Sequence, residues 1–275
     1  MKITLLPGDG IGVEIVDAAV EVLDAAAKKF GMTIEYDKQL IGGAAIDATG
    51  VPLPEATIAS AKTADAVLLG AVGGPKWDNV APEIRPEKGL LGIRKALGLY
   101  CNLRPIKVSR FVAHLSPLKN ERVSGTDLLI VRELTGGIYF GDKNEAAPDA
   151  DGVETASDVE IYTRPEVERI ARFAFEAAKK RRGKVTSVDK ANVLASSRMW
   201  RRIVGEMQAQ DYSGIELNNF YVDNCAMQLV LNPGQFDVVL TNNIFGDILS
   251  DEASVIAGSI GICLLYTSPS PRDCS

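Results

Sequence analysis

Strand-like and helix-like segments alternate along this chain, and that order constrains the fold more than any other feature of the sequence. A short apolar segment at residues 3–6 precedes a glycine turn and a run at 11–30 whose apolar residues recur at helical spacing. An extended segment at 33–36, a helix near 54–63 and a buried-strand run at 66–72 follow. Alternation of this kind is typical of an α/β fold.

The same order continues in the second half of the chain. Residues 128–134 form a strand-like run, and Pro165 opens a helix that Gly183 ends. Five apolar residues share the inward face of that helix: Val167, Ile170, Ala171, Ala174 and Ala178. Further on we expect a strand at 184–189, a helix at 196–208, a buried strand at 237–243 and a helix within 242–261.

The composition is that of an ordinary globular protein. The 275 residues are 46% hydrophobic and 24% charged, with a formal net charge of -6, and this length fits two domains or one large one. No apolar run approaches the ~18 residues of a membrane span, and the acidic balance gives a nucleic-acid partner weak support. The four cysteines lack metal-ligand spacing, which fits free thiols in a reducing compartment. We therefore expect a cytoplasmic protein with no membrane and no nucleic-acid partner.

Two aspartates four residues apart, Asp247 and Asp251, are candidate metal ligands. On a helix their side chains project about 40° apart, so both carboxylates can reach one hard divalent cation. The competing interpretation is a pair of solvated acids on an amphipathic helix, and the spacing alone leaves both open.

Three arginines near strand or helix ends are candidate anion ligands: Arg94, Arg104 and Arg132. A guanidinium fork binds a carboxylate through two parallel hydrogen bonds, and several converging forks suit a dicarboxylic acid. Taken singly, each arginine also fits a surface or interface ion pair. Together with the aspartates, they indicate an anionic substrate bridged to a cation.

The glycine turn near the start of the chain imitates a dinucleotide-binding fingerprint. LPGDGIGVE follows a strand and opens a helix, and Glu35 and Asp37 lie at the distance expected of a ribose ligand. The glycines stand at 8, 10 and 12, however, and Val13 occupies the third position of the motif. The turn fits either a phosphate ligand or a close approach of the backbone to a ligand or another strand.

Residues 140–161 are acidic, contain Gly and Pro, and hold few large apolar side chains. Such a segment leaves the core, either as a mobile loop or as an arm that grips a second subunit. Both interpretations stay open at this point.

Several longer motifs resemble one family in their order and spacing. They are LPGDGIG, GAVGGPKW, GLLGIRKALGLYCNLRP, VRELTGGIYFG, VDKANVL, YVDN and NNIFGDILSDEASVI. From Lys2 to about Ile262 the chain resembles the metal-dependent β-decarboxylating dehydrogenases, the isocitrate and isopropylmalate dehydrogenase family. The resemblance implies a two-domain α/β fold, not a Rossmann fold. It assigns 1–104 and 256–262 to a cofactor-side first domain, and 105–255 to a second domain with the substrate and metal ligands, the dimer interface and the arm at 140–161.

The resemblance also implies a reaction, the oxidation of a 2-hydroxy dicarboxylate by hydride transfer to NAD with loss of the β-carboxylate as carbon dioxide. Lys190 would take the hydroxyl proton, and Tyr139 would return a proton to the enol carbon. In a homodimer with shared active sites, Lys190 and Asp223 would reach the neighbouring subunit's site. The implied ligands are Arg94, Arg104, Arg132 and Asp223 for the substrate, and Asp223, Asp247 and Asp251 for Mg²⁺ or Mn²⁺.

Leu90 and Leu91 precede Arg94 by about one helical turn, and an apolar pair there would accept an isopropyl group. The expected substrate is therefore (2R,3S)-3-isopropylmalate, converted to 2-oxoisocaproate in leucine biosynthesis, ahead of tartrate, D-malate and homoisocitrate. The resemblance further implies a set of cofactor contacts: Ile11, Gly74, Pro75, Lys76, Trp77 and Glu87.

The last residues depart from this family. From about Cys263 the sequence CLLYTSPSPRDCS resembles the conceptual translation of a sequencing adaptor, where family members continue with a strand, helices and a loop for the adenosine half of the cofactor. We expect 263–275 to be non-native, the fold to be incomplete at its C-terminus, and the chain to show poor solubility and feeble activity. The alternatives are a genuine Pro- and Ser-rich terminus, and a fragment that binds metal and carboxylate without catalysis.

Overall fold

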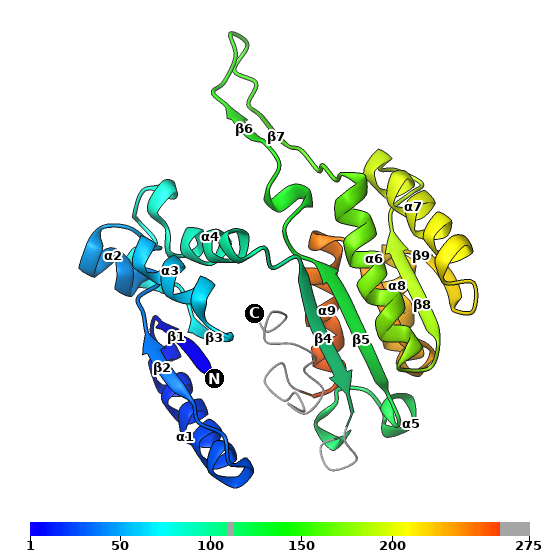
Figure 1. Ribbon diagram of the computed structural model, residues 1–275. Helices are drawn as coiled ribbons and strands as arrows, with labels where there is room; N and C mark the ends of the chain where they lie inside the picture. The colour runs from blue at the N-terminus through cyan, green and yellow to red at the C-terminus, as the bar shows by residue number, and fades with distance from the viewer. Residues whose placement is uncertain (109–112, 259–275) are drawn as a thin grey trace. The chain divides into compact units, whose positions relative to one another are not determined.

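The computed structural model describes residues 1–108 and 113–258, which divide after Leu99 into two compact units (Figure 1). The predicted non-native tail, 263–275, lies outside the described residues, as do 259–262. The predicted domain limit after residue 104 falls inside β4 (Cys101–Lys107), which pairs along its full length with a strand of the second unit. The domain limits of the whole fold stay a prediction.

The described part of the first unit is a parallel sheet in the order β2-β1-β3, with helices between the strands. The strands are β1 (Lys2–Gly8), β2 (Glu35–Lys38) and β3 (Ala66–Ala71). The helices are α1 (Gly12–Phe30), α2 (Gly43–Thr49), α3 (Glu55–Thr63) and α4 (Pro86–Leu97), with 3-10 helices η1 (Pro75–Trp77) and η2 (Pro82–Ile84). The strand predicted at 3–6 and the helices predicted at 11–30 and 54–63 are confirmed. The extended segment predicted at 33–36 begins only at Glu35.

Two glycines of the first turn, Gly8 and Gly12, allow close backbone packing. A Cβ on Gly8 would lie 2.0 Å from the carbonyl oxygen of Ala71, and one on Gly12 would lie 2.1 Å from that of Pro7. Gly8 also has a φ of +69°, which disfavours other residues. Of the two interpretations of this turn, close approach to another strand is therefore confirmed.

The sheet of the second unit has the order β4-β5-β10-β8-β9. β4 runs antiparallel to β5, whereas β5, β10, β8 and β9 are mutually parallel. The strands are β5 (Asp127–Glu133), β8 (Lys184–Asp189), β9 (Glu216–Tyr221) and β10 (Val238–Thr241). The remaining elements of this sheet and its covering layers are α5 (Asn120–Val123), α6 (Arg164–Lys179), α7 (Ala195–Asp211), α8 (Val222–Leu231), α9 (Asn243–Ile256), η3 (Ala113–Leu115), η4 (Gly137–Tyr139) and η5 (Pro233–Gln235).

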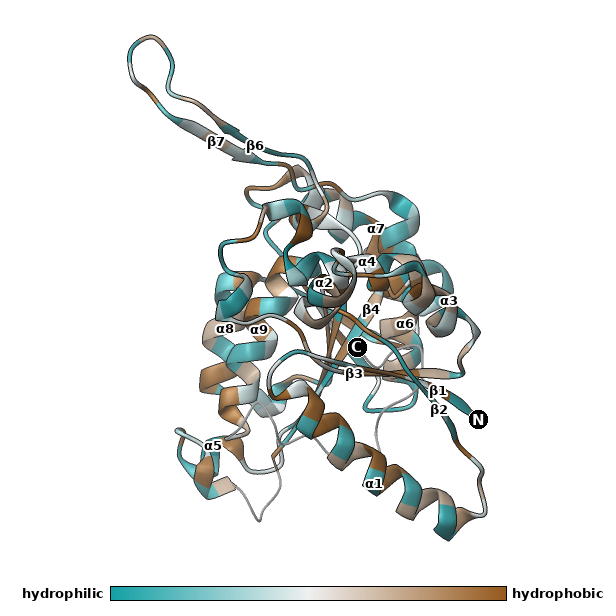
Figure 2. Cartoon of the chain, turned by 90° about the vertical axis from the view of Figure 1, so that its left-hand side faces the viewer, coloured by the Kyte–Doolittle hydropathy of each residue, from teal (hydrophilic) through white to brown (hydrophobic). Residues whose placement is uncertain are grey.

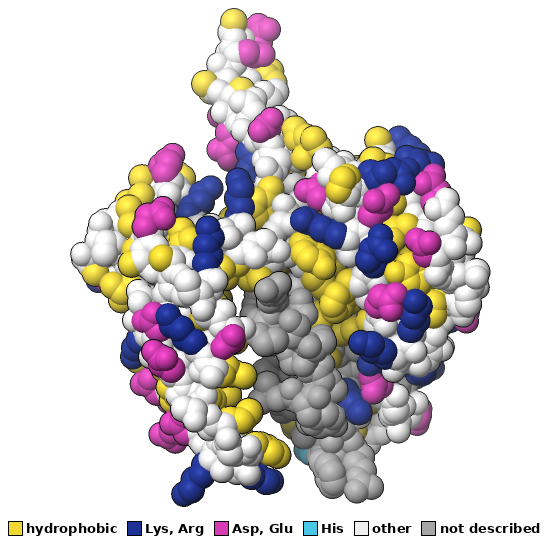
Figure 3. All heavy atoms as spheres, in the orientation of Figure 1, with side chains coloured by type: hydrophobic (Ala, Val, Ile, Leu, Met, Phe, Trp, Pro, Cys, Tyr) yellow, Lys and Arg dark blue, Asp and Glu magenta, His cyan; other side chains and the backbone are white. Residues whose placement is uncertain are grey.

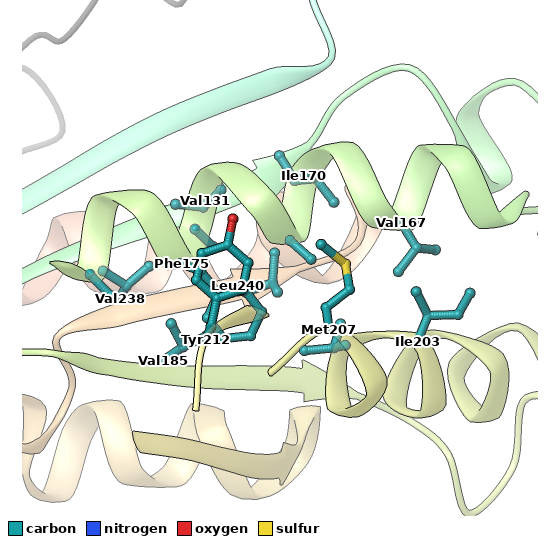
Figure 4. Close-up of a cluster of buried hydrophobic side chains, with 14 of the residues drawn as sticks. Val131, Val167, Ile170, Phe175, Val185, Ile203, Met207, Tyr212, Val238 and Leu240 are labelled. Atoms are coloured by element: carbon teal, nitrogen blue, oxygen red, sulfur yellow. The ribbon is translucent and has the colours of Figure 1, made fainter. Parts of the chain in front are cut away.

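Helices cover both faces of this second sheet. α6 and α7 pack on one face, where Phe175 stacks on Tyr212 beside Val131 and Leu240 (Figure 4). α8 and α9 pack on the other face against residues such as Ile130. Because both faces are covered, the strands can be apolar at successive positions, as the sequence predicted for 128–134 and 237–243.

α6 shows how local sequence sets an element. Thr163 and Glu166 form a capping box at its start, and Pro165 stands in its first turn. All five residues predicted to face inward are buried. The helix ends at Lys179, four residues before Gly183, whose φ of +76° lets its N–H donate to the carbonyl of Ala178 (3.1 Å).

The acidic segment forms a two-stranded antiparallel ribbon, β6 (Lys143–Ala146) paired with β7 (Thr155–Asp158), in which every strand residue is exposed. The ribbon extends away from the sheet of the second unit (Figure 1), and acidic side chains lie on it (Figure 3). It is thus an arm in shape, and its predicted contact with a second subunit stays a prediction. Within the described residues, no helix is long and apolar enough to cross a bilayer.

Candidate active site

Most of the predicted site residues of the second unit lie at one edge of its sheet. The four parallel strands end there, and ligands of open α/β sheets bind outside the carboxyl ends of such strands. Arg132 is the second-last residue of β5, and Lys190 follows β8 directly. Asp223 stands in the first turn of α8, after β9, and Asp247 lies on α9, after β10.

Arg132, Asp247 and Tyr139 contact one another at this edge. The Nη1 group of Arg132 donates to Oδ1 of Asp247, and the Tyr139 hydroxyl donates to Oδ2 of the same carboxylate at 2.6 Å. The guanidinium carbon lies 5.6 Å from the centre of the Tyr139 ring. A buried cation, a carboxylate and a phenol are thus combined in one cluster.

Partial burial, and then the hydrogen bond to Asp247, raise the pKa of the Tyr139 hydroxyl above its ordinary value. The phenol consequently keeps its proton at neutral pH. A protonated phenol that is partly exposed can donate a proton to a bound molecule, which is the role that the resemblance implied.

α9 holds the predicted metal ligands as the spacing required. Asn242 caps the helix by accepting the N–H of Phe245 (2.9 Å), and Asp247 and Asp251 follow on one face. A Cβ on Gly246 would lie 2.6 Å from Cγ of Arg132, so glycine lets the helix pack directly on the arginine stem. Asp251 is exposed, and Asp247 is half-buried.

The donor set fits a hard divalent cation only in part. Carboxylate oxygens at 247 and 251 are the ligands that Mg²⁺ and Mn²⁺ prefer. The described residues of one chain nevertheless contain no group of three or more acidic, His or Cys side chains that could hold a metal. The predicted third ligand, Asp223, is bonded instead to Lys190. A site with three carboxylate ligands would therefore need one ligand from outside the described residues of this chain. A second copy of the chain would supply it if the active sites are shared, as the resemblance implies.

Lys190 and Asp223 form an ion pair at the ends of adjacent strands. Nζ of Lys190 lies 2.7 Å from Oδ1 of Asp223, and this hydrogen bond lowers the pKa of the aspartate carboxyl. Behind the pair, the buried Asp189 accepts two hydrogen bonds of 2.8 Å from Arg201. Arg201 in turn lies 4.9 Å from the ring of Tyr221, next to α8. Sequence reasoning missed Asp189 and Arg201, although an acid directly before a candidate lysine was visible in VDKAN.

Arg104 lies in the middle of β4, not at a strand end as expected. The antiparallel register pairs Asn102 with Arg132, so Asn102, Arg104 and Arg132 share one face of the sheet. Nε of Arg104 donates to Oδ1 of Asn102 at 3.0 Å. Arg104 therefore lies on the same face as Arg132, as a shared site requires. The pairing of β4 with β5 places it there, and not a position at the end of a strand.

Arg94 belongs to the first unit, on α4, and its meeting with Arg104 and Arg132 stays a prediction. Leu90 and Leu91 lie four and three residues before it on the same helix, and all three are half-buried. The predicted placement of an apolar pair one turn before the arginine is thus confirmed as local geometry.

The predicted cofactor contacts also lie in the first unit. Trp77 donates from Nε1 to Asp47 (3.2 Å), and Lys76 donates to the same carboxylate (2.5 Å). The Trp77 ring packs so closely on α2 that a Cβ on Gly43 would lie 2.3 Å from it. Ile11 precedes α1 and is exposed. Next to η1 lies a hollow of about 280 Å³ lined by Gly74, Trp77, Asp78, Arg85, Pro86 and Glu87.

This hollow agrees with the residues named for the cofactor, since three of its lining residues, Gly74, Trp77 and Glu87, are in that set. Pro75 opens the 3-10 helix that carries Trp77. An aromatic ring beside an open polar hollow can receive a planar group.

Asp9 organises this part of the first unit and was missed as a candidate. Its buried carboxylate accepts the N–H groups of Gly43 (2.8 Å), Ala44 (2.7 Å) and Gly73 (2.8 Å). It thereby caps α2 and fixes the loop before Gly74. The only local signal was an acid between two glycines after a strand.

Comparison with known proteins agrees with these observations. The profile of the isocitrate/isopropylmalate dehydrogenase family matches residues 2–269. A 3-isopropylmalate dehydrogenase of Carboxydothermus hydrogenoformans is 58% identical over 262 residues, covering 95% of this chain and 70% of that protein. One of Bacillus subtilis is 54% identical over 261 residues, with 95% and 71% covered.

Solved structures give the same result for the fold. The isocitrate dehydrogenase of Methylococcus capsulatus superposes with a TM-score of 0.78 at 38% identity, covering 95% of this chain and 72% of that one. A β-decarboxylating dehydrogenase of Thermococcus kodakarensis gives a TM-score of 0.71 at 39% identity, with 95% and 70% covered. The fold is that of these dehydrogenases, and the chain belongs to the isocitrate/isopropylmalate dehydrogenase family.

Proposed function

We propose that the protein to which this chain belongs oxidises (2R,3S)-3-isopropylmalate to 2-oxoisocaproate and carbon dioxide with reduction of NAD, as a step of leucine biosynthesis. The observation that carries the proposal is the cluster of Arg132, Asp247 and Tyr139 at the carboxyl edge of the second sheet, in a chain more than half identical to relatives named 3-isopropylmalate dehydrogenase.

Arg132 and Arg104 are the proposed carboxylate ligands of the second unit. They share one face of the sheet, and Arg132 is held rigidly with part of its fork turned toward Asp247. A guanidinium that is already oriented loses little entropy when it binds a carboxylate, which supports this role. Arg94 would supply a third fork from the first unit.

Tyr139 and Lys190 are the proposed proton carriers. The raised pKa of Tyr139 keeps its proton available for the enol carbon after carbon dioxide leaves. Lys190 would take the proton from the substrate hydroxyl, and its partner Asp223 would bind both metal and substrate. When bound, NAD would accept the hydride, and Mg²⁺ or Mn²⁺ between Asp247, Asp251 and Asp223 would stabilise negative charge on the substrate oxygens.

Leu90 and Leu91 support isopropylmalate over the more polar substrates of the family. Both are half-buried one turn before Arg94, so part of each apolar side chain is accessible to a bound group. A third carboxylate, as in isocitrate, would need a polar partner there. An apolar contact of this size is worth about 1–3 kcal/mol of discrimination.

A homodimer is part of the proposal. The outer faces of α8 and α9 expose large apolar side chains that a second copy could cover: Met227, Val230, Leu231, Ile248 and Val255. These helices carry Asp223, Asp247 and Asp251, so pairing them would bring the third carboxylate from a neighbouring copy. The exposed ribbon of β6 and β7 would add a second contact. A cytoplasmic location completes the proposal, supported by the buried free thiol of Cys225.

The test is Mn²⁺-dependent reduction of NAD, with 3-isopropylmalate, D-malate and isocitrate assayed in parallel. We expect NADH formation with isopropylmalate at a kcat/KM at least tenfold above that with the other two acids. Preference for D-malate or isocitrate would overturn the assigned substrate. Binding of isopropylmalate and Mn²⁺ without NADH formation would overturn the dehydrogenase activity and leave a carboxylate-binding protein.

A further inference from the structure

Asn243, the first residue of α9, uses every hydrogen-bonding position of its side-chain amide beneath the candidate site. It is 1% exposed. Its Oδ1 accepts hydrogen bonds from Nε (3.0 Å) and Nη2 (2.7 Å) of Arg132. Its Nδ2 donates to the carbonyl oxygens of Leu134 (3.2 Å) and Gly136 (3.1 Å). A primary amide offers two donors and two lone pairs, so this side chain is fully satisfied.

The first consequence concerns the direction of the Arg132 fork. Asn243 holds the edge formed by Nε and Nη2, while Nη1 donates to Asp247. These bonds use three of the five N–H donors of the guanidinium. Because a guanidinium is planar, fixing one edge fixes where the remaining donors point.

The second consequence concerns the turn that leads to Tyr139. Leu134 and Gly136 flank this turn, which continues into η4, where Tyr139 stands. Glu133 fixes the same turn from the other side by accepting the N–H of Gly136 at 2.8 Å. The Tyr139 hydroxyl then reaches Asp247, which lies one turn after Asn243 on α9. One amide therefore links the arginine, the tyrosine turn and the helix with the aspartates.

The chemistry of the contacts requires an amide. An aspartate would place an oxygen against two carbonyl oxygens and would add a second carboxylate to Arg132. An apolar side chain would leave the guanidinium edge and both carbonyls unpaired. We propose that Asn243 is a positioning residue that sets the direction of the Arg132 fork and the course of the turn to Tyr139. The role in substrate binding rests on the proposed function.

Two variants and a matched control test this role. Asn243→Ala removes both halves of the amide, whereas Asn243→Asp keeps an acceptor for Arg132 and loses the donors to the turn. Tyr162→Phe is the control, because it removes the hydroxyl that accepts the backbone N–H of the same Asn243 (3.0 Å) and keeps both the ring that packs beside Gly136 and the side-chain amide of Asn243 itself.

The main readout is the Nε–H signal of Arg132 in ¹⁵N NMR, assigned with Arg132→Lys. In the unaltered chain we expect a dispersed signal that exchanges slowly with water. It should disappear or exchange rapidly in Asn243→Ala, and persist in Asn243→Asp and Tyr162→Phe. A rapidly exchanging Arg132 signal in the unaltered chain would overturn the proposal even if no variant folded.

The second readout is the affinity for 3-isopropylmalate with Mn²⁺, measured by calorimetry. Asn243→Ala should weaken the affinity roughly ten- to a hundredfold, and Tyr162→Phe should weaken it less than threefold. We expect the two variants to lose a similar amount of thermal stability, so the difference in affinity does not come from stability. Equal losses of affinity in both variants would reduce Asn243 to a structural residue. An intact NMR pattern without any isopropylmalate binding would instead sink the proposed function and leave the positioning of Arg132 standing.

Discussion

The two units of this chain differ in how completely they bury their sheets. In the second unit, apolar residues on both faces of β5, β10 and β8 are buried under helices, and Figure 4 shows the cluster on the face covered by α6 and α7. In the first unit, β3 is only half-buried at every position, and α1, on which hydrophobic and hydrophilic stretches alternate (Figure 2), exposes Val13, Ile15 and Val22. The apolar run at 66–72 predicted a strand correctly and its burial wrongly. An apolar run is buried only where both faces of its strand are covered.

The sharpest test of this difference is a pair of core truncations. Phe175→Ala should lower the free energy of unfolding by about 3–5 kcal/mol, because the ring is fully buried and stacks on Tyr212 at 4.6 Å. Leu68→Ala in β3 should cost less than about 2 kcal/mol, since that side chain is only partly buried. Urea unfolding followed by circular dichroism measures both. Equal losses would contradict the comparison.

Substitution of one acid in each unit should give a slightly smaller difference in stability. Asp237, fully buried in the second unit, accepts Nε of Arg181 (2.8 Å) and the N–H of Arg182 (2.9 Å). Asp237→Asn should cost about 3 kcal/mol, because it removes the fully buried charge that pairs with Nε of Arg181 and leaves that guanidinium only Asp127 as a charge partner among the described residues. Asp47→Asn in the first unit removes the charge of an exposed pair with Lys76 and keeps an oxygen that can accept the Nε1–H of Trp77, so it should leave the unfolding midpoint unchanged. A large shift from the second substitution would show that the first unit depends on its surface charges.

Substitution of two helical glycines should have opposite effects, one at the candidate site and one elsewhere in the second unit. Gly246→Ala should cost about 1–3 kcal/mol and weaken isopropylmalate binding, because the new Cβ would overlap the stem of Arg132. Gly205→Ala, on α7, meets open space and should stabilise the protein by about 0.5–1 kcal/mol. Thermal unfolding and calorimetric titration report the two effects. Unimpaired binding by the first variant would show that Arg132 can move aside.

The smallest expected effect is a pH dependence at the base of the arm. Burial raises the pKa of Glu160, which accepts hydrogen bonds from Asn242 and Ser196. As pH rises, the unfolded chain ionises this carboxyl first, so the folded state loses stability until the pH passes the folded pKa. Between about pH 4 and neutrality, the stability of Glu160→Gln should therefore rise relative to that of the unaltered protein, since Glu ionises near 4.3 in unfolded chains. Unfolding midpoints of both proteins are measured across that range. A difference between the two midpoints that does not change with pH would contradict this prediction.

Elements with strong local patterns could be predicted from the sequence. Helical periodicity and capping residues marked α6, and continuous apolar runs marked β5 and β10. β4 was missed because CNLRPIK contains a proline and shows no alternation, and it becomes a strand through its pairing with β5. α2 was missed because its start is capped by Asp9, 34 residues before Gly43. Contacts of such long sequence separation leave no local signal.

The same division applies to the site. The spacing of Asp247 and Asp251 predicted their shared helix face, the chemistry of the guanidinium group singled out Arg132, and the resemblance supplied Tyr139. What brings Arg132 to α9 is Asn243, 111 residues away in sequence, together with a glycine at 246 that permits the contact. Asn243 and Gly246 have no side-chain chemistry that would mark them as candidate site residues in the sequence. They act by holding Arg132, which is the group proposed to bind substrate.

The central claim is that α9 presents Asp247 and Asp251 to one divalent cation beside Arg132, completed by Asp223 of a second copy. Crystals grown with Mn²⁺ and 3-isopropylmalate, measured at the manganese absorption edge, test it directly. We predict one anomalous peak within about 2.0–2.4 Å of oxygens from Asp247 and Asp251, with a substrate carboxylate on Arg132. A peak elsewhere, with these carboxylates bonded only to protein and water, would contradict the account.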